Sequence, residues 1–311
     1  MARIFVESWS PEYGAPLDAA TLAPAEGSVD DTVETSAWAP RDGIDDGIER
    51  VAFVDGVRRI DARLTIDDPE DGPVPGLCGT FVVGAVHWSR ATARSEVADE
   101  QVQRWAVLAG GRAEIFPTVD IQPPYETITI ADRDGDALVH ALQTRMRAAE
   151  GHLAARVAAE AFVFADGPLN EPAPAQVVGT IKSHRVTYLA PERGTIVAAL
   201  GVGQRTPLFT IGDYRRYSWY VRLARLPGGH SWTGIVRCEA SGQLPAAEVV
   251  AIADRTAALL PLVASEPHID PRAPQNLVPI GALERQLRHR MGDPGLVYRA
   301  LRAAVSEPRA S

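Results

Sequence analysis

The chain has 311 residues, 46% of them hydrophobic, which is enough to bury a large core in one domain or in one domain with attachments. Its net charge of −9 argues against bulk electrostatic binding of nucleic acid, although clustered carboxylates that hold divalent cations add negative charge of this kind. No stretch approaches the roughly 18 consecutive apolar residues of a membrane span, and the first residues lack the apolar run of a signal peptide. Cys78 and Cys238 form neither a zinc motif nor a disulfide framework, which favours a reduced cytoplasmic compartment.

The order of predicted elements begins with an extended arm. Residues 8–48 are rich in proline, glycine and acids, so we assign residues 1–48 to an N-terminal arm and residues 49–311 to one domain with a C-terminal helical part. At the start of that domain, apolar and alternating runs predict an antiparallel meander of strands at 51–54, 60–66 and 80–88. A polar helix is expected over about 94–109.

The longest predicted helix, about 136–160, follows one or two strands within 113–131. Its apolar residues repeat at three and four and form one stripe: Leu138, Leu142, Met146, Ala149, Leu153 and Val157. Asp134 or Asp136 can cap its N-terminus. A short buried strand at 161–165 comes directly after this helix. Further strands are expected near 176–182, 206–211, 217–226 and 232–239, and further helices near 245–263, 279–291 and 294–305.

Three acidic residues stand at informative places in this order. Asp55 ends or interrupts the first strand, Glu150 lies beside the apolar stripe of the long helix, and Asp166 ends the strand that follows it. If that strand lies parallel beside the first, the three carboxylates meet at one end of the sheet, where ligand sites usually lie. This order of acids after a meander is typical of RNase H-like nucleases. The predicted fold is therefore α/β, an RNase H-like mixed sheet flanked by helices, with additional strands and C-terminal helices.

Carboxylates that lie close together cannot all stay ionised without cations. Two Mg²⁺ or Mn²⁺ ions roughly 4 Å apart can bridge them, activate a water and stabilise the leaving oxygen of a phosphodiester. Each acid also has a simpler interpretation. Asp55-Gly56 and Asp166-Gly167 are common turn pairs, and Glu150 can be a solvated helix residue.

Basic residues offer two weaker signals. Lys182 is the one lysine among 31 basic residues, so it either meets a need for a compact ammonium or has survived by chance. Arginines and aromatics alternate in YRRYSWYVRLAR (214–225). That pattern suits either the stacking of unpaired bases or a strand with one exposed basic face.

Four motifs in this order resemble the NurA family of DNA-end-processing nucleases, over about residues 50–240. They are FVDGVRR (53–59), RMRAAEGHLA (145–154), FVFADGPL (162–169) and VVGTIKSHR (177–185), with RTPLF (205–209) and YVRL (220–223) in support. The resemblance implies a homodimer that cleaves DNA ends and single strands with Mn²⁺, in partnership with a HerA-type hexameric ATPase. By position it implies that Asp55, Glu150 and Asp166 are metal ligands, and that Lys182 contacts a phosphate.

The C-terminal part departs from the pattern of that family. There the family has a helix whose histidine completes the metal site, but DPRAPQNLVPIGALERQLRHRMGD (270–293) has no histidine at that place. Glu284 falls near it and borders the apolar stripe of the predicted helix, while His289 comes five residues later. Glu284 is therefore a candidate fourth ligand, and its alternative is a surface ion pair with Arg288 one turn on.

Three functional classes remain open on these observations. The first is an active nuclease, which the three acids support. The second is a non-catalytic scaffold of the same fold that binds an ATPase partner or DNA, which the missing histidine supports. The third, a hydrolase of small phosphoesters, needs a closed pocket that a sequence does not reveal.

Overall fold

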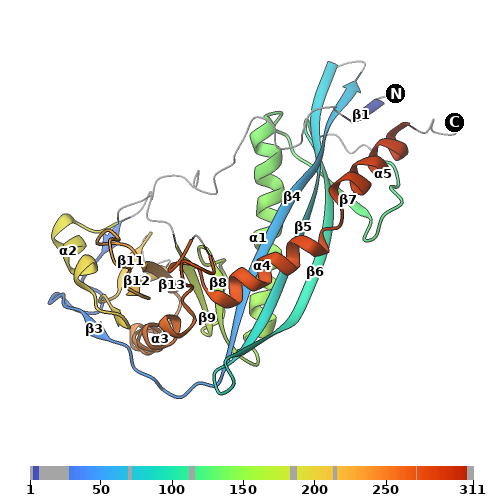
Figure 1. Ribbon diagram of the computed structural model, residues 1–311. Coiled ribbons are helices and arrows are strands. Elements are labelled where there is room, and N and C mark those ends of the chain that lie inside the picture. Colours follow the sequence, from blue (N-terminus) through green and yellow to red (C-terminus); the bar gives the residue numbers. More distant parts are fainter. Residues whose placement is uncertain are drawn as a thin grey trace.

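The computed structural model describes residues 3–6, 28–68, 72–111, 116–182, 188–212, 216–270 and 272–306. These residues form one large mixed sheet with helices packed on it (Figure 1). The main path of the sheet runs in the order β2 (Val29–Asp30), β11 (Phe209–Ile211), β12 (Arg216–Arg222), β13 (Ile235–Ser241), β9 (Val177–Ile181), β8 (Phe162–Asp166), β4 (Arg50–Asp68), β5 (Gly72–Ser89), β6 (Arg94–Leu108) and β7 (Tyr125–Thr129). Off this path, β1 (Arg3–Val6) pairs with β4, and β10 (Gln204–Arg205) pairs with β12 and with β3 (Arg41–Asp42).

The centre of the sheet is an antiparallel meander followed by parallel strands, and of the predicted pairings it contains that of the first strand with the strand after the long helix. β6, β5 and β4 are antiparallel neighbours, and β8 and then β9 continue the sheet in parallel with β4. The helix α1 (Gly135–Val157) leads back from the meander to β8, and Asp134 caps it by accepting a hydrogen bond from Asp136 N. The prediction of a mixed α/β, RNase H-like sheet is confirmed.

The first half of β4 separates two cores because its side chains alternate. Ala52 and Val54 pack in the core that includes α1, whereas Val51 and Phe53 pack in the core that includes α3 (Ala246–Leu259) and α4 (Val278–Arg290). The 3-10 helix η1 (Leu260–Val263) continues α3. With a side-chain period of two, Asp55 faces the α4 side of the sheet, and Gly56 faces the α1 side.

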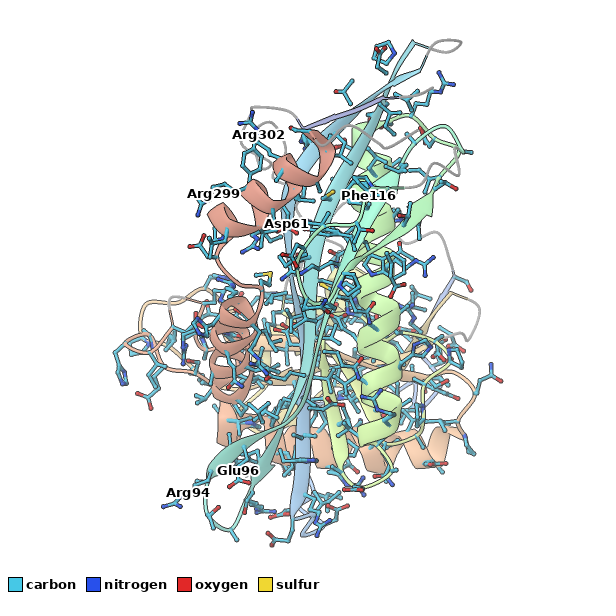
Figure 2. All side chains as sticks on the ribbon, turned by 90° about the vertical axis from the view of Figure 1, so that its right-hand side faces the viewer. Asp61, Arg94, Glu96, Phe116, Arg299 and Arg302 are labelled. Atoms are coloured by element: carbon cyan, nitrogen blue, oxygen red, sulfur yellow. The ribbon has the colours of Figure 1, made fainter. Side chains whose placement is uncertain are left out.

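The last helix lies against the far half of the long strands. α5 (Pro294–Ser306) packs on β1 and β4 through Val297 and Leu301. Arg299 and Arg302 are exposed on it (Figure 2). All three helices predicted for the C-terminal part are present, and α2 (Pro191–Ala199) is a helix that the sequence did not predict.

Two predicted features of the meander are wrong. Asp55 does not end its strand, because β4 continues through Asp55-Gly56 to Asp68 and takes in the predicted strand at 60–66. The turn interpretation of Asp55-Gly56 is therefore excluded. Pairing of β4 with β5 along its whole length maintains an extended backbone where the sequence alone suggests a turn.

The segment predicted as a polar helix at 94–109 is the strand β6. It pairs with β5 from Gly76↔Leu108 to Ser89↔Arg94, and this pairing overrides the helix propensity of its Glu, Ala and Gln residues. Within 113–131, β7 matches the second predicted strand. Residues 116–119 of the first are not a strand, and its first three residues lie outside the described ones.

A buried polar network joins the long strands to the end of α4. Asp61, which Figure 2 labels, sits at a register shift of β4 and accepts hydrogen bonds from Thr80 Oγ1, Tyr125 OH and Arg59 Nε. Arg59 also donates to the carbonyl oxygens of Met291 and Gly292, just beyond α4. This network fixes the end of the helix that carries Glu284.

The described residues bear on two other expectations. Cys78 and Cys238 are both free and buried, and burial raises the pKa of both thiols. Among the residues that the structure describes, no helix combines the length and the apolar character that crossing a membrane requires.

Candidate active site

Asp55 and Asp166 lie side by side because β4 and β8 are parallel neighbours in register. The last paired residues are Val54 and Ala165, and each aspartate is the next residue of its strand. The predicted parallel pairing of these strands is confirmed. Asp166 also ends β8, as predicted, whereas Asp55 lies within β4.

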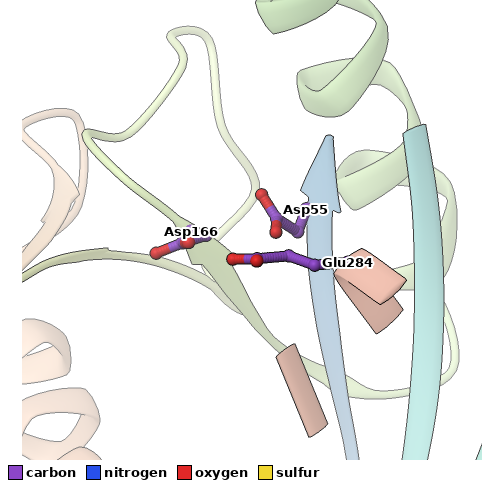
Figure 3. A group of neighbouring side chains, drawn as sticks. All are labelled: Asp55, Asp166 and Glu284. Carbon is purple, nitrogen blue, oxygen red and sulfur yellow. The ribbon is translucent and has the colours of Figure 1, made fainter. Parts of the chain in front are cut away.

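Glu284 of α4 completes a group of three carboxylates, which we call the acidic cluster: Asp55, Asp166 and Glu284. One oxygen from each lies within 4.8 Å of the others, and Figure 3 shows the three side chains converging from two strands and a helix. Asp55 and Glu284 are each only 7% exposed. Glu284 is buried among Ile280, Leu283 and Leu287, the stripe that its sequence position indicated.

Glu150 approaches from the opposite side of the sheet. It lies on α1, and its carboxylate occupies the space beside Gly56 where a side chain would begin. A β-carbon placed on Gly56 would lie 2.3 Å from Glu150 Oε1. Glycine at position 56 thus leaves the room that the end of the Glu150 side chain occupies, and a larger residue there would displace this carboxylate. Glu150 is not one of the three residues whose oxygens meet within the acidic cluster.

The carboxylates at this place disfavour their own ionisation. Burial, followed by the charges of Asp166 and Glu150, raises the pKa of Asp55 well above its usual range. Burial also raises the pKa of Glu150 to about 8, with Asp166 adding to the effect and Arg147 opposing it. Four acids in such proximity are a site for positive charge.

Lys182 supplies one such charge. Its Nζ donates to Asp166 Oδ2 at 2.8 Å and to Asn276 Oδ1 at 2.7 Å. Lys182 thus lies at the site, as the sequence resemblance implied, and its ammonium sits between two oxygen acceptors. The phosphate contact proposed for it remains a prediction.

Arg272 holds Glu284 more closely than the predicted partner does. Its Nη1 and Nη2 each donate to one oxygen of Glu284 at 2.9 Å, whereas Arg288 Nη2 is 3.5 Å from Glu284 Oε2. Hydrogen bonds to Glu284 raise the pKa of Arg272. The Glu284–Arg288 pair therefore exists, but Glu284 is buried and faces the other acids rather than forming only a surface pair.

The loop after Asp166 is fixed by its neighbours. Gly167 N donates to Thr180 O at 2.8 Å, and Leu169 N donates to the buried Glu239 at 3.0 Å. A β-carbon on Gly179 would lie 2.7 Å from Leu169 N, so this strand accepts only glycine there. Such support from β9 and β13 holds the end of β8, and with it Asp166, in one place.

The acidic cluster fits a hard divalent cation. Mg²⁺ and Mn²⁺ prefer oxygen ligands, and Asp55, Asp166 and Glu284 offer carboxylate oxygens. The cluster opens into a pocket of about 560 Å³ that Arg58, Arg59 and Arg288 also line. Anionic oxygen ligands for a cation therefore face basic side chains that suit an anionic substrate.

Residues 216–225, the described part of the arginine–aromatic segment, do not present their aromatic rings to solvent. In β12, Tyr217, Trp219 and Tyr220 are buried, and the equally buried Arg222 donates to four backbone carbonyls, those of Leu200, Thr233, Ala198 and Ser231. Both interpretations of that pattern are wrong for β12, because its aromatic rings and Arg222 are buried. Residues 213–215 lie outside the described ones.

Three residues near the site were not predicted from the sequence: Asp270, Arg272 and Asn276. All three precede α4, and their hydrogen bonds join them to one another and to Lys182 and Glu284. Nothing in the spacing of 270–276 indicates such contacts. The nearest signal was the departure of this segment from the family pattern.

No family model matches the sequence, and no curated protein matches it. Among solved structures, the fold is similar to the NurA nuclease from Sulfolobus solfataricus, at a TM-score of 0.42 and 12% identity over 71% of this chain and 76% of that one. It is also similar to the catalytic domain of human Endonuclease V, at a TM-score of 0.30 and 16% identity over 79% and 83%. The first belongs to the family that the motifs resemble. Likenesses of this degree assign no activity to this chain.

We expect Glu150→Gln to stabilise the metal-free protein at pH 8 and to change its stability little at pH 5. The pKa of Glu150 is about 8 in the folded chain and ordinary when unfolded, so stability is lost as pH rises from about 4.5 to 8. One pKa unit is worth about 1.4 kcal/mol. Because the residue as a whole is half-buried rather than fully buried, we take the total as about 2 kcal/mol. Urea unfolding of the wild type and of Glu150→Gln, each with a chelator at both pH values, measures the difference in the free energy of unfolding. An equal difference at pH 5 and pH 8 would contradict it.

Proposed function

We propose that this chain is a divalent-metal-dependent nuclease that hydrolyses phosphodiester bonds in DNA, with Mn²⁺ or Mg²⁺ as the metal. The observation that supports it is the convergence of Asp55, Asp166 and Glu284 within 4.8 Å in a pocket that three arginines also line. A bound divalent cation supplies activation of a water and stabilisation of charge on the leaving oxygen.

In this proposal each residue of the site has a separate task. Asp55, Asp166 and Glu284 hold the metal, and Glu150 adds negative charge from the α1 side of Asp55. Lys182 orients Asp166 through its 2.8 Å hydrogen bond. Arg58 and Arg288 bind phosphates of the DNA strand at the edge of the pocket, since guanidinium groups match phosphate geometry.

A test of the function itself uses end-labelled single-stranded and double-stranded DNA with Mn²⁺. Cleavage that a chelator stops, and that Asp55→Asn lacks, would support the proposal. The alternative of a non-catalytic scaffold expects DNA binding without cleavage under the same conditions. Mn²⁺ at a hundred times its dissociation constant should also stabilise the wild type by about 2.7 kcal/mol, and Asp55→Asn much less.

We expect Lys182→Arg to cleave DNA at least about tenfold more slowly than the wild type, although the charge is kept. The ammonium of Lys182 lies within 2.8 Å of two oxygen acceptors, and a larger planar guanidinium cannot occupy that space without moving Asp166. Initial cleavage rates at saturating Mn²⁺ measure the effect. Equal rates would mean that lysine survives at this position by chance.

The resemblance to NurA nucleases supports three further parts of the proposal. They are action on DNA ends or single strands in repair, a homodimer, and a HerA-type hexameric ATPase as partner. We also propose a reduced cytoplasmic compartment, which the two free cysteines support. The division into an arm at 1–48 and a nuclease domain at 49–311 stays a prediction.

A further inference from the structure

A chain of ion pairs and hydrogen bonds joins two members of the acidic cluster to each other. It runs through Asp166, Lys182, Asn276, Asp270, Arg272 and Glu284, and we call it the charge chain. Its contacts measure 2.6–3.2 Å, and Asn276 at its centre is fully buried. Negative and positive side chains alternate along it on either side of the neutral Asn276.

The Lys182 end of the charge chain is tightly held. Asn276 accepts from Lys182 with its oxygen and donates to Asp270 Oδ2 with its nitrogen at 2.6 Å. Asn276 therefore holds the ammonium of Lys182 in contact with Asp166. A lysine with two oxygen acceptors at 2.7 and 2.8 Å is a fixed positive charge beside Asp166.

At the other end, Arg272 is held by more bonds, although its side chain is 52% exposed and that of Lys182 is 19% exposed. The Arg272 guanidinium makes a two-bond fork with Glu284 and also contacts Asp270, through Nε to Oδ1 at 3.2 Å and Nη2 to Oδ2 at 3.1 Å. Asp270 is only 7% exposed. With both carboxylates engaged, Arg272 stands as a second fixed positive charge, this time beside Glu284. Arg288 adds a weaker positive charge beside Glu284, with its Nη2 at 3.5 Å from Glu284 Oε2.

The ion pairs of the charge chain reduce the negative charge that a bound metal ion would have to balance. Asp55, Glu150, Asp166, Glu284 and Asp270 formally carry five negative charges. The positive charges of Lys182, Arg272 and Arg288, which form ion pairs with Asp166, Asp270 and Glu284, offset three of them. Two negative charges remain, which balance a single divalent cation. A second cation would lie beside Lys182 or Arg272 and be repelled at short range.

We propose that the site binds one divalent cation per chain rather than two, and that Lys182 and Arg272 supply the positive charge of the second. The proposal rests on the proposed function only in that the acidic cluster is the metal site. In this proposal Lys182 and Arg272 determine how many metal ions the site binds.

The number of bound ions tests the proposal directly. Mn²⁺ alone is titrated into the full chain, with isothermal calorimetry for the stoichiometry and electron paramagnetic resonance for the free ion. Lys182→Gln removes the charge, and Lys182→Arg keeps it. Arg90→Gln is a matched control, because Arg90 pairs with Asp45 away from the site. Circular dichroism reports whether each variant is folded.

We expect the wild type, Lys182→Arg and Arg90→Gln to bind one Mn²⁺ each, and Lys182→Gln to bind a second ion at least about tenfold more tightly than the wild type does. Should Lys182→Gln fail to fold, Arg272→Gln makes the same test at the other end of the charge chain. Two ions of similar affinity in the wild type would overturn the proposal and leave the proposed function intact. A single ion in a folded Lys182→Gln would also overturn it. Absence of Mn²⁺ binding by the wild type would instead contradict the proposed function.

Discussion

Replacing Asp55 or Asp166 with Asn is expected to lower the rate of DNA cleavage by about 10³-fold or more while the chain stays folded. Each substitution removes one of the three carboxylates that converge in the acidic cluster. A catalytic metal is worth several kcal/mol of transition-state stabilisation, and each 1.4 kcal/mol is about tenfold in rate. The amide of Asn keeps the size of the side chain, so the packing of β4 and β8 is retained.

The two variants should differ in stability when no metal is present. The raised pKa of Asp55 means that its ionisation opposes folding at neutral pH, so Asp55→Asn should be as stable as the wild type or more stable. Asp166→Asn loses its ion pair with Lys182 and should gain nothing. Thermal melts with a chelator measure both, and Asp45→Asn, at an exposed acid away from the site, is the control. If either site variant cleaves DNA at a rate close to that of the wild type, the assigned site is wrong.

Replacing Glu284 with Gln is expected to weaken Mn²⁺ binding and to slow cleavage, each on the order of 10²-fold. Gln keeps the shape of the side chain within the apolar stripe of α4 but removes an anionic oxygen from the cluster. Arg272 keeps its contacts with Asp270, so the segment before α4 stays in place. Calorimetric titration with Mn²⁺ and initial cleavage rates measure the two effects.

Glu284→His separates metal binding from charge at the same position. Imidazole is also a ligand for such metals, so this variant should recover part of the affinity and of the activity that Glu284→Gln loses. Equal, wild-type Mn²⁺ affinity in both variants would show that Glu284 is only the ion-pair partner of Arg272. If Glu284→His recovers cleavage activity without a change in DNA affinity, the recovery comes from metal binding.

The sequence by itself indicated which acids lie near one another. The strand, helix and strand that carry Asp55, Glu150 and Asp166 have hydrophobic periods of two and of three to four, and such periods are local properties that survive in the fold. The order of these elements then led to the parallel pairing of β4 with β8, because a helix between two strands favours that arrangement. Glu284 was a candidate because it falls near the place where the family pattern has a histidine and borders the stripe of α4.

Only the tertiary structure decided the contacts that set the charge and the geometry of the site. The segment 94–108 is a strand because β5 offers it a partner, and Asp55 lies within a continuous strand for the same reason. Glu150 reaches Asp55 past the missing side chain of Gly56 on another element. Lys182 meets Asn276 across 94 residues of chain. Such contacts depend on which distant surfaces pack together, and no local spacing of residues encodes them.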